Sequence, residues 1–269
     1  MSVRIIQVDA FTPRPFAGNP AAVCLLDAPV PESWMQQVAR EMNLSETAFV
    51  ERRSDDGVLG LRWFTPTVEV DLCGHATLAA AHVLWEEHRL DPSRPALFDT
   101  RSGRLAARKR DDWIELDFPS TPVGDGLPAA ELEPIARALA AEPVFGGRSR
   151  FDLLVELASE AEVRRLAPDF RRLSSLPVRG VIATALSGSH ECDFVSRFFA
   201  PAAGVDEDPV TGSAHCCLAP YWALRLGRSE LVGHQVSDRG GVVKVCLDGD
   251  RVAILGQAVT VMRGELVTD

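Results

Sequence analysis

Two short turns in the sequence carry residue types suited to proton transfer. The segment 70–77 reads V-D-L-C-G-H-A-T and holds Cys73 and His75, and the segment 204–214 reads G-V-D-E-D-P-V-T-G-S-A and holds Asp208. Glu46 closes a third polar stretch, N-L-S-E. Two carboxyl groups in a closed site cannot both ionise cheaply, so one serves as acid and the other as base. These residues predict an enzyme that removes a proton next to a substrate carboxylate and returns it at another atom of the substrate. Such a reaction needs neither a metal nor an organic cofactor.

Each glycine turn runs into an apolar segment that predicts a buried helix. Gly74 precedes an alanine-rich stretch without charge until Glu86, and Gly212 precedes a similar stretch that continues to about Leu226. The first amides of a buried helix lack intrahelical partners and attract anions, including carboxylates. We therefore expect both helix starts to hold substrate carboxylate and developing enolate charge.

The two turns share a pattern that suggests an internal duplication. Phe64-Thr65-Pro66 precedes the first and Phe199-Ala200-Pro201 precedes the second, and each turn contains Gly-x-Ala. Each copy lies about equally deep in its half of the chain. The pattern predicts two similar domains whose helix starts face each other across an interdomain cleft.

Composition narrows the class of protein. The 269 residues carry a net charge of −10, which argues against nucleic acid or an anionic membrane as partner. The chain starts without a secretion signal, no apolar run reaches the roughly 18 residues of a membrane span, and the six cysteines form no C-x-x-C pair. A cytoplasmic protein is expected. Nucleotide-binding and zincin motifs are absent.

The best linker candidate is 119–128, with three prolines and two glycines. It predicts an N-terminal domain over 1–118 and a C-terminal domain over 129–258. Each half holds many short strands around one apolar helix, which indicates an α+β fold. Glu46 lies between a predicted helix at 31–42 and a strand at 47–50, a junction where loops commonly present chemistry.

Several of these residues also have plainer interpretations. Cys73 either fills a turn or acts chemically, because a thiol at a helix start is expected to have a lowered pKa. His215 and Cys216 lie within the second apolar segment and are expected to pack in the core. A metal site built from Cys73, His75 and these two residues is the least favoured alternative.

With these residues in view, the chain resembles the PhzF-like (phenazine biosynthesis isomerase) family over nearly its full length. The resemblance rests on six ordered blocks: V-D-A-F at 8–11, G-N-P at 18–20, N-L-S-E-T-A-F at 43–49, F-T-P at 64–66, C-G-H-A-T at 73–77 and E-D-P-V-T-G-S-A at 207–214.

This resemblance implies the diaminopimelate epimerase-like fold, with two pseudo-symmetric domains, each a strand barrel around a central helix, in a homodimer. It also implies that the last strand, about 259–269, returns to the first domain. Glu46 would be the proton shuttle assisted by His75 and Asp208. The positions that would bind substrate are Asn19, Ser45, Gly74, Gly212 and Ser213.

The resemblance leaves three functions open. The first is a cofactor-independent isomerase using Glu46, as in the characterised proton shift on trans-2,3-dihydro-3-hydroxyanthranilate. The second is an amino-acid epimerase or racemase, because related epimerases carry two cysteines in such turns, and this chain has Cys73 at one and Asp208 at the other. The third is a non-catalytic binding protein that retains the cleft.

Overall fold

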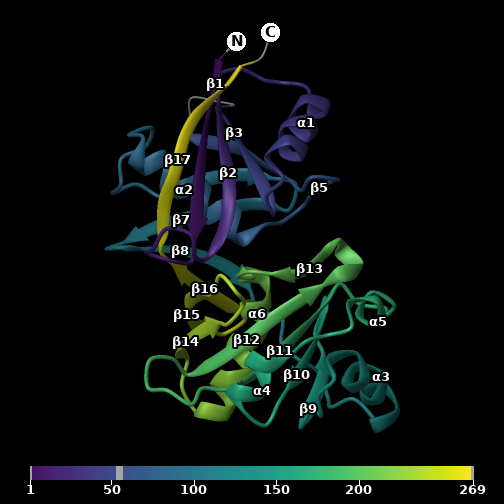
Figure 1. Ribbon diagram of the computed structural model, residues 1–269. Coiled ribbons are helices and arrows are strands. Elements are labelled where there is room, and N and C mark those ends of the chain that lie inside the picture. Colours follow the sequence, from purple (N-terminus) through teal and green to yellow (C-terminus); the bar gives the residue numbers. More distant parts are fainter. Residues whose placement is uncertain (1, 53–56, 268–269) are drawn as a thin grey trace. The chain divides into compact units, whose positions relative to one another are not determined.

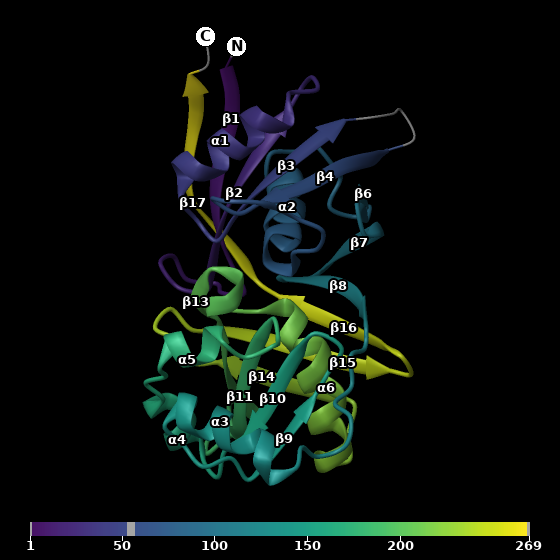
Figure 2. The same cartoon turned by 90° about the vertical axis from the view of Figure 1, so that its right-hand side faces the viewer.

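The computed structural model describes residues 2–52 and 57–267. The chain divides into two compact units, the first formed by residues 1–117 and 255–269 and the second by 118–254. The segment 119–128 therefore falls inside the second unit. Figures 1 and 2 label the elements of both units.

The first unit holds a long mixed sheet and two helices. Its strands are β1 (Ser2–Ala10), β2 (Asn19–Leu26), β3 (Glu46–Arg52), β4 (Val58–Phe64), β5 (Glu69–Val70), β6 (Ala96–Thr100), β7 (Gly103–Arg110), β8 (Trp113–Pro119) and β17 (Ala258–Val267). Its helices are α1 (Glu32–Met42) and α2 (Gly74–Glu86). The C-terminal strand β17 pairs antiparallel with β1, from Ala10 opposite Ala258 to Val3 opposite Leu266 (Figure 1). The two ends of the chain thus complete one sheet.

The sheet of the first unit wraps around α2. From one end its order is β17-β1-β2-β3-β4-β6-β7-β8, with β2 parallel to β3 and β4 parallel to β6. The helix packs against β17, β1, β2, β3 and β7, strands drawn from both ends of that order (Figure 2). Ten of the 13 residues of α2 are buried, because alanines let the strands approach closely. The shorter α1 covers a separate core that includes Met35, Val38 and Phe49.

The second unit repeats this connectivity. Its strands are β9 (Phe145–Arg148), β10 (Asp152–Glu156), β11 (Gly180–Leu186), β12 (Phe194–Ala200), β13 (Val205–Asp208), β14 (Glu230–Gln235), β15 (Gly241–Asp248) and β16 (Arg251–Gly256). Its helices are α3 (Ala129–Leu139), α4 (Glu160–Arg165), α5 (Phe170–Ser174) and α6 (Gly212–Leu226), with a 3₁₀ turn η1 at Pro201–Ala203.

Strand pairing makes the duplication explicit. In the first unit β2 is parallel to β3, β3 is antiparallel to β4, and β4 pairs with both the short β5 and the parallel β6. In the second unit β10, β11, β12, β13 and β14 pair in that same way. The buried helix follows the short strand in both, as α2 after β5 and α6 after β13. The two sequence turns therefore occupy equivalent positions in two copies of one motif.

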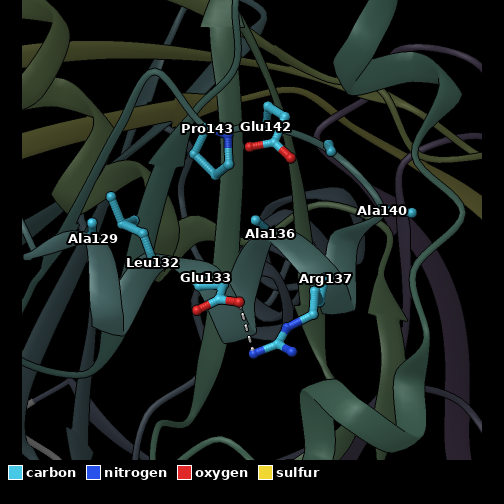
Figure 3. A pocket seen from close by; sticks show the side chains of 9 residues that line it. Ala129, Leu132, Glu133, Ala136, Arg137, Ala140, Glu142 and Pro143 are labelled. Atoms are coloured by element: carbon cyan, nitrogen blue, oxygen red, sulfur yellow. Dashed lines mark ion pairs between the residues drawn. The ribbon is translucent and has the colours of Figure 1, made fainter.

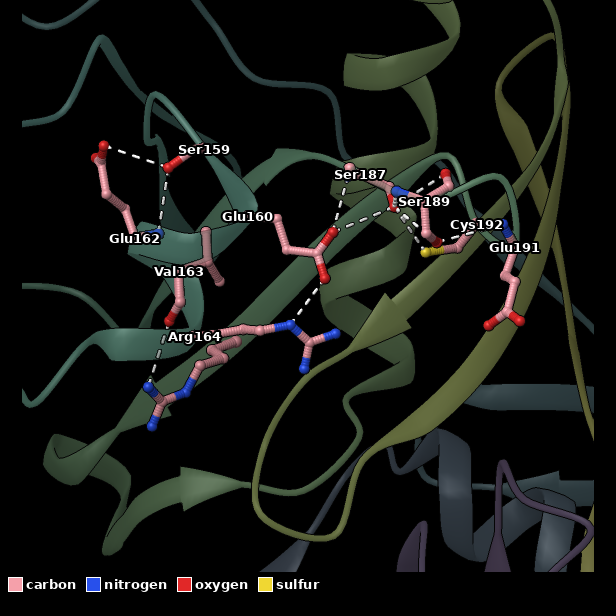
Figure 4. Close-up of polar contacts among 11 residues, drawn as sticks. Ser159, Glu160, Glu162, Val163, Arg164, Ser187, Ser189, Glu191 and Cys192 are labelled. Carbon is pink, nitrogen blue, oxygen red and sulfur yellow. Dashed lines mark hydrogen bonds and ion pairs between the residues drawn. The ribbon is translucent and has the colours of Figure 1, made fainter.

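Helices α3, α4 and α5 cover the outer face of the second sheet over an apolar core that includes Leu139, Val163 and Phe199. Helix α4 is tied to the loop after β11 through Glu160 (Figure 4). Its carboxylate accepts the Gly188 amide at 2.8 Å and the Arg164 Nε at 2.7 Å. Both contacts lower the pKa of Glu160, the Gly188 amide most strongly. A short helix thus keeps a fixed place on the sheet.

Candidate active site

The start of α2 offers amides that its own cap does not satisfy. Cys73 is the N-cap residue in extended conformation, and no side-chain oxygen accepts a capping hydrogen bond there. Thr77 closes the first turn instead, donating from Oγ1 to the Cys73 carbonyl at 2.5 Å. The Ala76 amide hydrogen-bonds the Cys73 sulfur, and the first amides of a helix generally attract anions.

Glu46 and His75 meet at this helix start. Glu46 is the first residue of β3, aligned with Ala21 of the parallel strand β2, and His75 is the second residue of α2. The Glu46 Oε2 lies 3.0 Å from His75 Nε2, and the two side chains are 18% and 6% exposed. A carboxylate and an imidazole held this closely can exchange a proton.

The opposite edge of the imidazole is held as well. Asn19 Nδ2 lies 3.2 Å from His75 Nδ1, and Cys73 Sγ lies 3.6 Å from the same nitrogen. Asn19 is fully buried at the start of β2, next to the strand that carries Glu46. The ring is therefore fixed from both sides, with Nε2 directed at Glu46.

Burial and charge set the protonation of this cluster. Burial opposes a charged His75 ring, but the interactions with Cys73 and Glu46 outweigh it, so the pKa of His75 lies well above its ordinary value. For Cys73, burial and then the Glu46 charge raise the thiol pKa. The expected lowering of the Cys73 pKa by the helix start is wrong, because desolvation of a thiolate at a 6% exposed residue exceeds the helix effect. Cys73 is a thiol at neutral pH.

The second unit builds a different cluster at the equivalent place. Asp208 ends β13, and its Oδ2 accepts the Thr211 hydroxyl at 2.5 Å. Gln235, at the end of β14 and fully buried, holds the same turn from the other side. Its Nε2 donates to the Asp208 carbonyl at 2.7 Å, and its Oε1 accepts the Thr211 amide at 2.8 Å. The Asp208 turn is thus anchored to the sheet.

Ser213 occupies the position in α6 that His75 occupies in α2. Its Oγ accepts a hydrogen bond from Arg179 Nη2 at 3.0 Å. Arg179 forms a two-point ion pair with the buried Asp152, at 2.9 and 2.6 Å, and stacks on the rings of Phe151 and Phe198. Where the first unit places a carboxylate and an imidazole, the second places a rigid guanidinium.

The N-cap carbonyl is tied in the same way in both units. His215 Nδ1 donates to the Thr211 carbonyl at 2.9 Å, as Thr77 donates to the Cys73 carbonyl in α2. Burial lowers the pKa of His215 to about 4, so the ring is neutral. It packs against Phe194 and is inaccessible to solvent, and Cys216 is buried beside it. The prediction of core roles for both residues is confirmed.

The structure distributes the predicted site residues between the units. Asn19, Glu46, Cys73 and His75 gather in the first unit around the start of α2, and Gly74 is the first residue of that helix. Ser45 is half-buried immediately before β3.

Asp208, Gly212 and Ser213 lie in the second unit along β13 and the start of α6. Sequence reasoning missed Gln235 and Arg179. Gln235 did leave a signal, since it is a polar residue on the buried side of β14, in register with Leu231 and Gly233.

Among the described residues, one group of side chains has ligand atoms close enough to hold a metal ion, and it consists of Glu46, Cys73 and His75. His215 and Cys216, which the alternative metal hypothesis required, do not belong to that group. Two hollows on the surface of the described residues contain no predicted site residue. One lies along α3, where Glu133 and Arg137 pair at 3.3 Å (Figure 3), and the other contains His82 and Trp85.

Comparison with known proteins decides the family. The model of the family described as "Phenazine biosynthesis-like protein" matches residues 8–264. The chain belongs to this family. It is 53% identical over 268 residues to an uncharacterized isomerase of Halalkalibacterium halodurans, covering 99% of both chains. A crystal structure of a phenazine biosynthesis protein of the PhzF family from Enterococcus faecalis superposes with a TM-score of 0.91 at 41% identity, covering 100% of both chains.

Family membership confirms the predicted recognition and fold class. The chain is an isomerase of α+β architecture. The fold extends to more distant structures. A probable proline racemase from Agrobacterium radiobacter K84 superposes with a TM-score of 0.67 at 10% identity, covering 99% of this chain and 93% of that one. None of the helices in the described ranges combines the length and apolar character that a membrane crossing demands.

Proposed function

We propose that this protein is a cofactor-independent isomerase that shifts a proton on a small carboxylate or amino-acid-like substrate, with Glu46 as the proton carrier. The observation that carries this proposal is the 3.0 Å contact between Glu46 Oε2 and His75 Nε2 at the start of α2.

In the proposed reaction Glu46 acts first as a base. Its carboxylate removes a proton from the carbon next to the substrate carboxylate, and the resulting carboxylic acid returns that proton at another atom of the substrate. His75 assists because its raised pKa keeps the ring charged beside Glu46, where the ion pair holds the carboxylate in position. A positioned acid–base group of this kind contributes roughly 10²–10⁴-fold in rate.

The helix starts are proposed to bind negative charge. The first amides of α2, from Gly74 onward, would hold the substrate carboxylate and the enolate-like charge that forms when the proton leaves. Gly212 and Ser213 at the start of α6 are proposed to bind a further polar group of the substrate, and Asp208 to assist the proton transfer. Asn19 and Ser45 are proposed to line the substrate site of the first unit.

Solvent exchange tests the role of Glu46. The wild-type protein is incubated in D₂O with a library of small carboxylic and amino acids, and mass spectrometry detects the substrates that gain deuterium. Glu46→Gln should abolish exchange on every substrate found. Glu41→Gln, at an exposed position on α1, is the matched control and should exchange at the wild-type rate. Undiminished exchange by Glu46→Gln would remove the proposal.

A second candidate function is an epimerase or racemase that uses Cys73 with Asp208. The 3.6 Å contact between Cys73 Sγ and His75 Nδ1 favours it, because the His75 ring stabilises the thiolate form of Cys73 and so opposes the effect of burial on the thiol pKa. This function requires inactivation by thiol alkylation with protection by substrate. Full activity in Cys73→Ser would exclude it and leave Glu46 as the carrier.

We also infer a cytoplasmic homodimer. The family resemblance supports the dimer, and the described chain holds six free cysteines and no disulfide, a pattern typical of a reducing compartment. Light scattering coupled to size-exclusion chromatography tests the dimer, with a monomer mass as the contradicting result.

A further inference from the structure

Strand register aligns the two copies of the motif residue by residue. Glu46 is the first residue of β3, and Gly180 is the first residue of β11. In each copy the next residue is opposite the phenylalanine that begins a Phe-x-Pro sequence. The pairings that define the alignment are Thr47–Phe64 and Ala21–Glu46 in the first unit, and Val181–Phe199 and Asp152–Gly180 in the second. Glu46 and Gly180 are therefore equivalent residues of the two copies.

The second copy has no carboxylate at the position of Glu46. A Cβ added to Gly180 would lie 2.4 Å from Phe198 Cζ and 2.8 Å from its Cε2. A larger residue would displace the Phe198 ring, whose centroid lies 5.6 Å from the guanidinium carbon of Arg179. The second copy therefore serves the substrate with other side chains.

Two arginines occupy the positions in the second copy that correspond to Asn19 and Ser45 in the first. Arg179 directly precedes β11, as Ser45 directly precedes β3. Arg150 lies two residues before the β10 residue that is opposite the start of β11, and Asn19 lies two residues before the β2 residue that is opposite the start of β3. Asn19 and Ser45 are proposed to line the substrate site of the first unit. The second unit places a guanidinium group at each equivalent position.

Arg179 is held rigidly and still has hydrogen-bond donors to offer. The buried Asp152 accepts hydrogen bonds from Nε and Nη2, at 2.9 and 2.6 Å, and Ser213 Oγ accepts another from Nη2 at 3.0 Å. A guanidinium group has five N–H bonds, so the two on Nη1 are without a partner among the described residues. The side chain is 40% exposed, so a ligand can reach it. A donor fixed in advance loses less entropy when it binds an anion.

Arg150 brings a second positive charge to the same part of the second unit. The ring centroid of Phe151 lies 5.0 Å from the guanidinium carbon of Arg150 and 5.3 Å from that of Arg179. Asp152 compensates the charge of Arg179. Arg150 is exposed and has no ion pair with any described residue. One positive charge is therefore in excess, which matches the single charge of a carboxylate.

We propose that Arg150 and Arg179 bind a second carboxylate of the substrate and that the isomerase therefore selects small dicarboxylic acids. This inference rests on the proposed function, and it makes the polar group assigned to Gly212 and Ser213 an anion. Guanidinium donors match carboxylate oxygens in both charge and geometry. No proton is transferred at this site, so the two arginines govern binding rather than the proton shift.

Paired probes test the arginines through binding alone. The full-length protein is titrated calorimetrically with succinate, glutarate, adipate and pimelate, and with the monoamide of each, which has the same length but lacks the second charge. The diacid that binds best should bind at least about tenfold more tightly than its monoamide, since that is the contribution of a hydrogen bond to a charged group. Arg150→Gln should bring this ratio close to one and leave the affinity for the monoamide unchanged.

A second variant and a control separate recognition from folding. Arg179→Lys keeps a positive charge beside the buried Asp152 but loses the planar set of donors, so it should also lower the preference for the diacid. Arg165→Gln, at an exposed position on α4, removes the same charge from the same unit and should keep the wild-type preference. Circular dichroism establishes that each variant is folded.

The binding result can fail independently of the proposed reaction. A wild type that binds no diacid better than its monoamide, or a preference that survives in both variants, overturns the assignment of the arginines. If the preference depends on Arg150 in a protein that incorporates no deuterium into any acid of the library, the binding site stands and the isomerase proposal falls. Deuterium incorporation that requires Glu46, without any preference for diacids, would have the opposite meaning.

Discussion

Replacing Gln235 with methionine should loosen the turn that carries Asp208 and destabilise the protein. Methionine has a similar length but cannot make the 2.7 Å bond to the Asp208 carbonyl or the 2.8 Å bond to the Thr211 amide. Gln235 is fully buried and Thr211 is 7% exposed, so water cannot replace the bond to the Thr211 amide. An orphaned buried group costs about 1–3 kcal/mol, and the half-buried carbonyl recovers part of its loss from solvent. The free energy of unfolding should fall by about 2–4 kcal/mol.

Urea denaturation followed by circular dichroism measures this loss. Gln36→Met is the control, because Gln36 makes one hydrogen bond, 2.9 Å to the Thr65 carbonyl, at a half-buried site. It should cost about 0.5–1.5 kcal/mol. Without denaturant, at a temperature where the variant is folded, its rate of deuterium incorporation into substrate should be roughly tenfold to a hundredfold below that of the wild type. Misplacement of a catalytic group by about an ångström has a cost of this size. A Gln235→Met protein with wild-type stability would show that the amide does not anchor the turn.

Three further predictions concern stability. The folded pKa of His75 is raised, so its contribution to stability is complete below the unfolded pKa of about 6.5 and is lost as the pH rises through the folded pKa. The stability difference between wild type and His75→Gln should therefore shrink as the pH rises above about 6.5, and a difference independent of pH contradicts the pairing with Glu46. The folded pKa of His215 is about 4, so between about pH 6.5 and pH 4 the unfolded chain binds a proton at this residue that the folded chain does not. Over this range the free energy of unfolding of the wild type should fall by about 3 kcal/mol relative to His215→Gln, as measured by matched urea titrations. In Gly256→Ala, the new Cβ would lie 2.3 Å from Phe11 Cδ1 and 2.7 Å from Leu78 Cδ1. The free energy of unfolding should therefore fall by about 1–3 kcal/mol, and an unchanged melting curve would show that these side chains move aside without cost.

Local signals in the sequence were sufficient to predict the helix starts. Gly74 and Gly212 each begin a buried helix, because uncharged, alanine-rich segments follow them. The position of Glu46 at the start of β3 also follows from local pattern, since a helix and a strand meet there. Neither helix has a polar face, and this pattern predicts that both helices are buried by the strands of a sheet.

Contacts between distant segments could not be predicted in this way. Gln235 reaches Thr211 across 24 positions of sequence, and Arg179 reaches Ser213 across 34, so neither pairing has a local pattern. The pKa of Cys73 depends on how deeply the first unit buries the thiol and on the charge of Glu46, which only the folded chain brings near. The short strands β5 and β13 are likewise too brief for their alternation to be read.

The repeated motif has diverged in its polar groups while keeping its backbone connections. Each copy secures its own cluster through contacts internal to that copy: Asn19 fixes the imidazole in one, and Asp152 fixes the guanidinium in the other. The contacts that fix Arg179 thus share no residue with those that fix His75. A protein built from two such copies can change the polar groups of one copy without losing the contacts that fix the polar groups of the other.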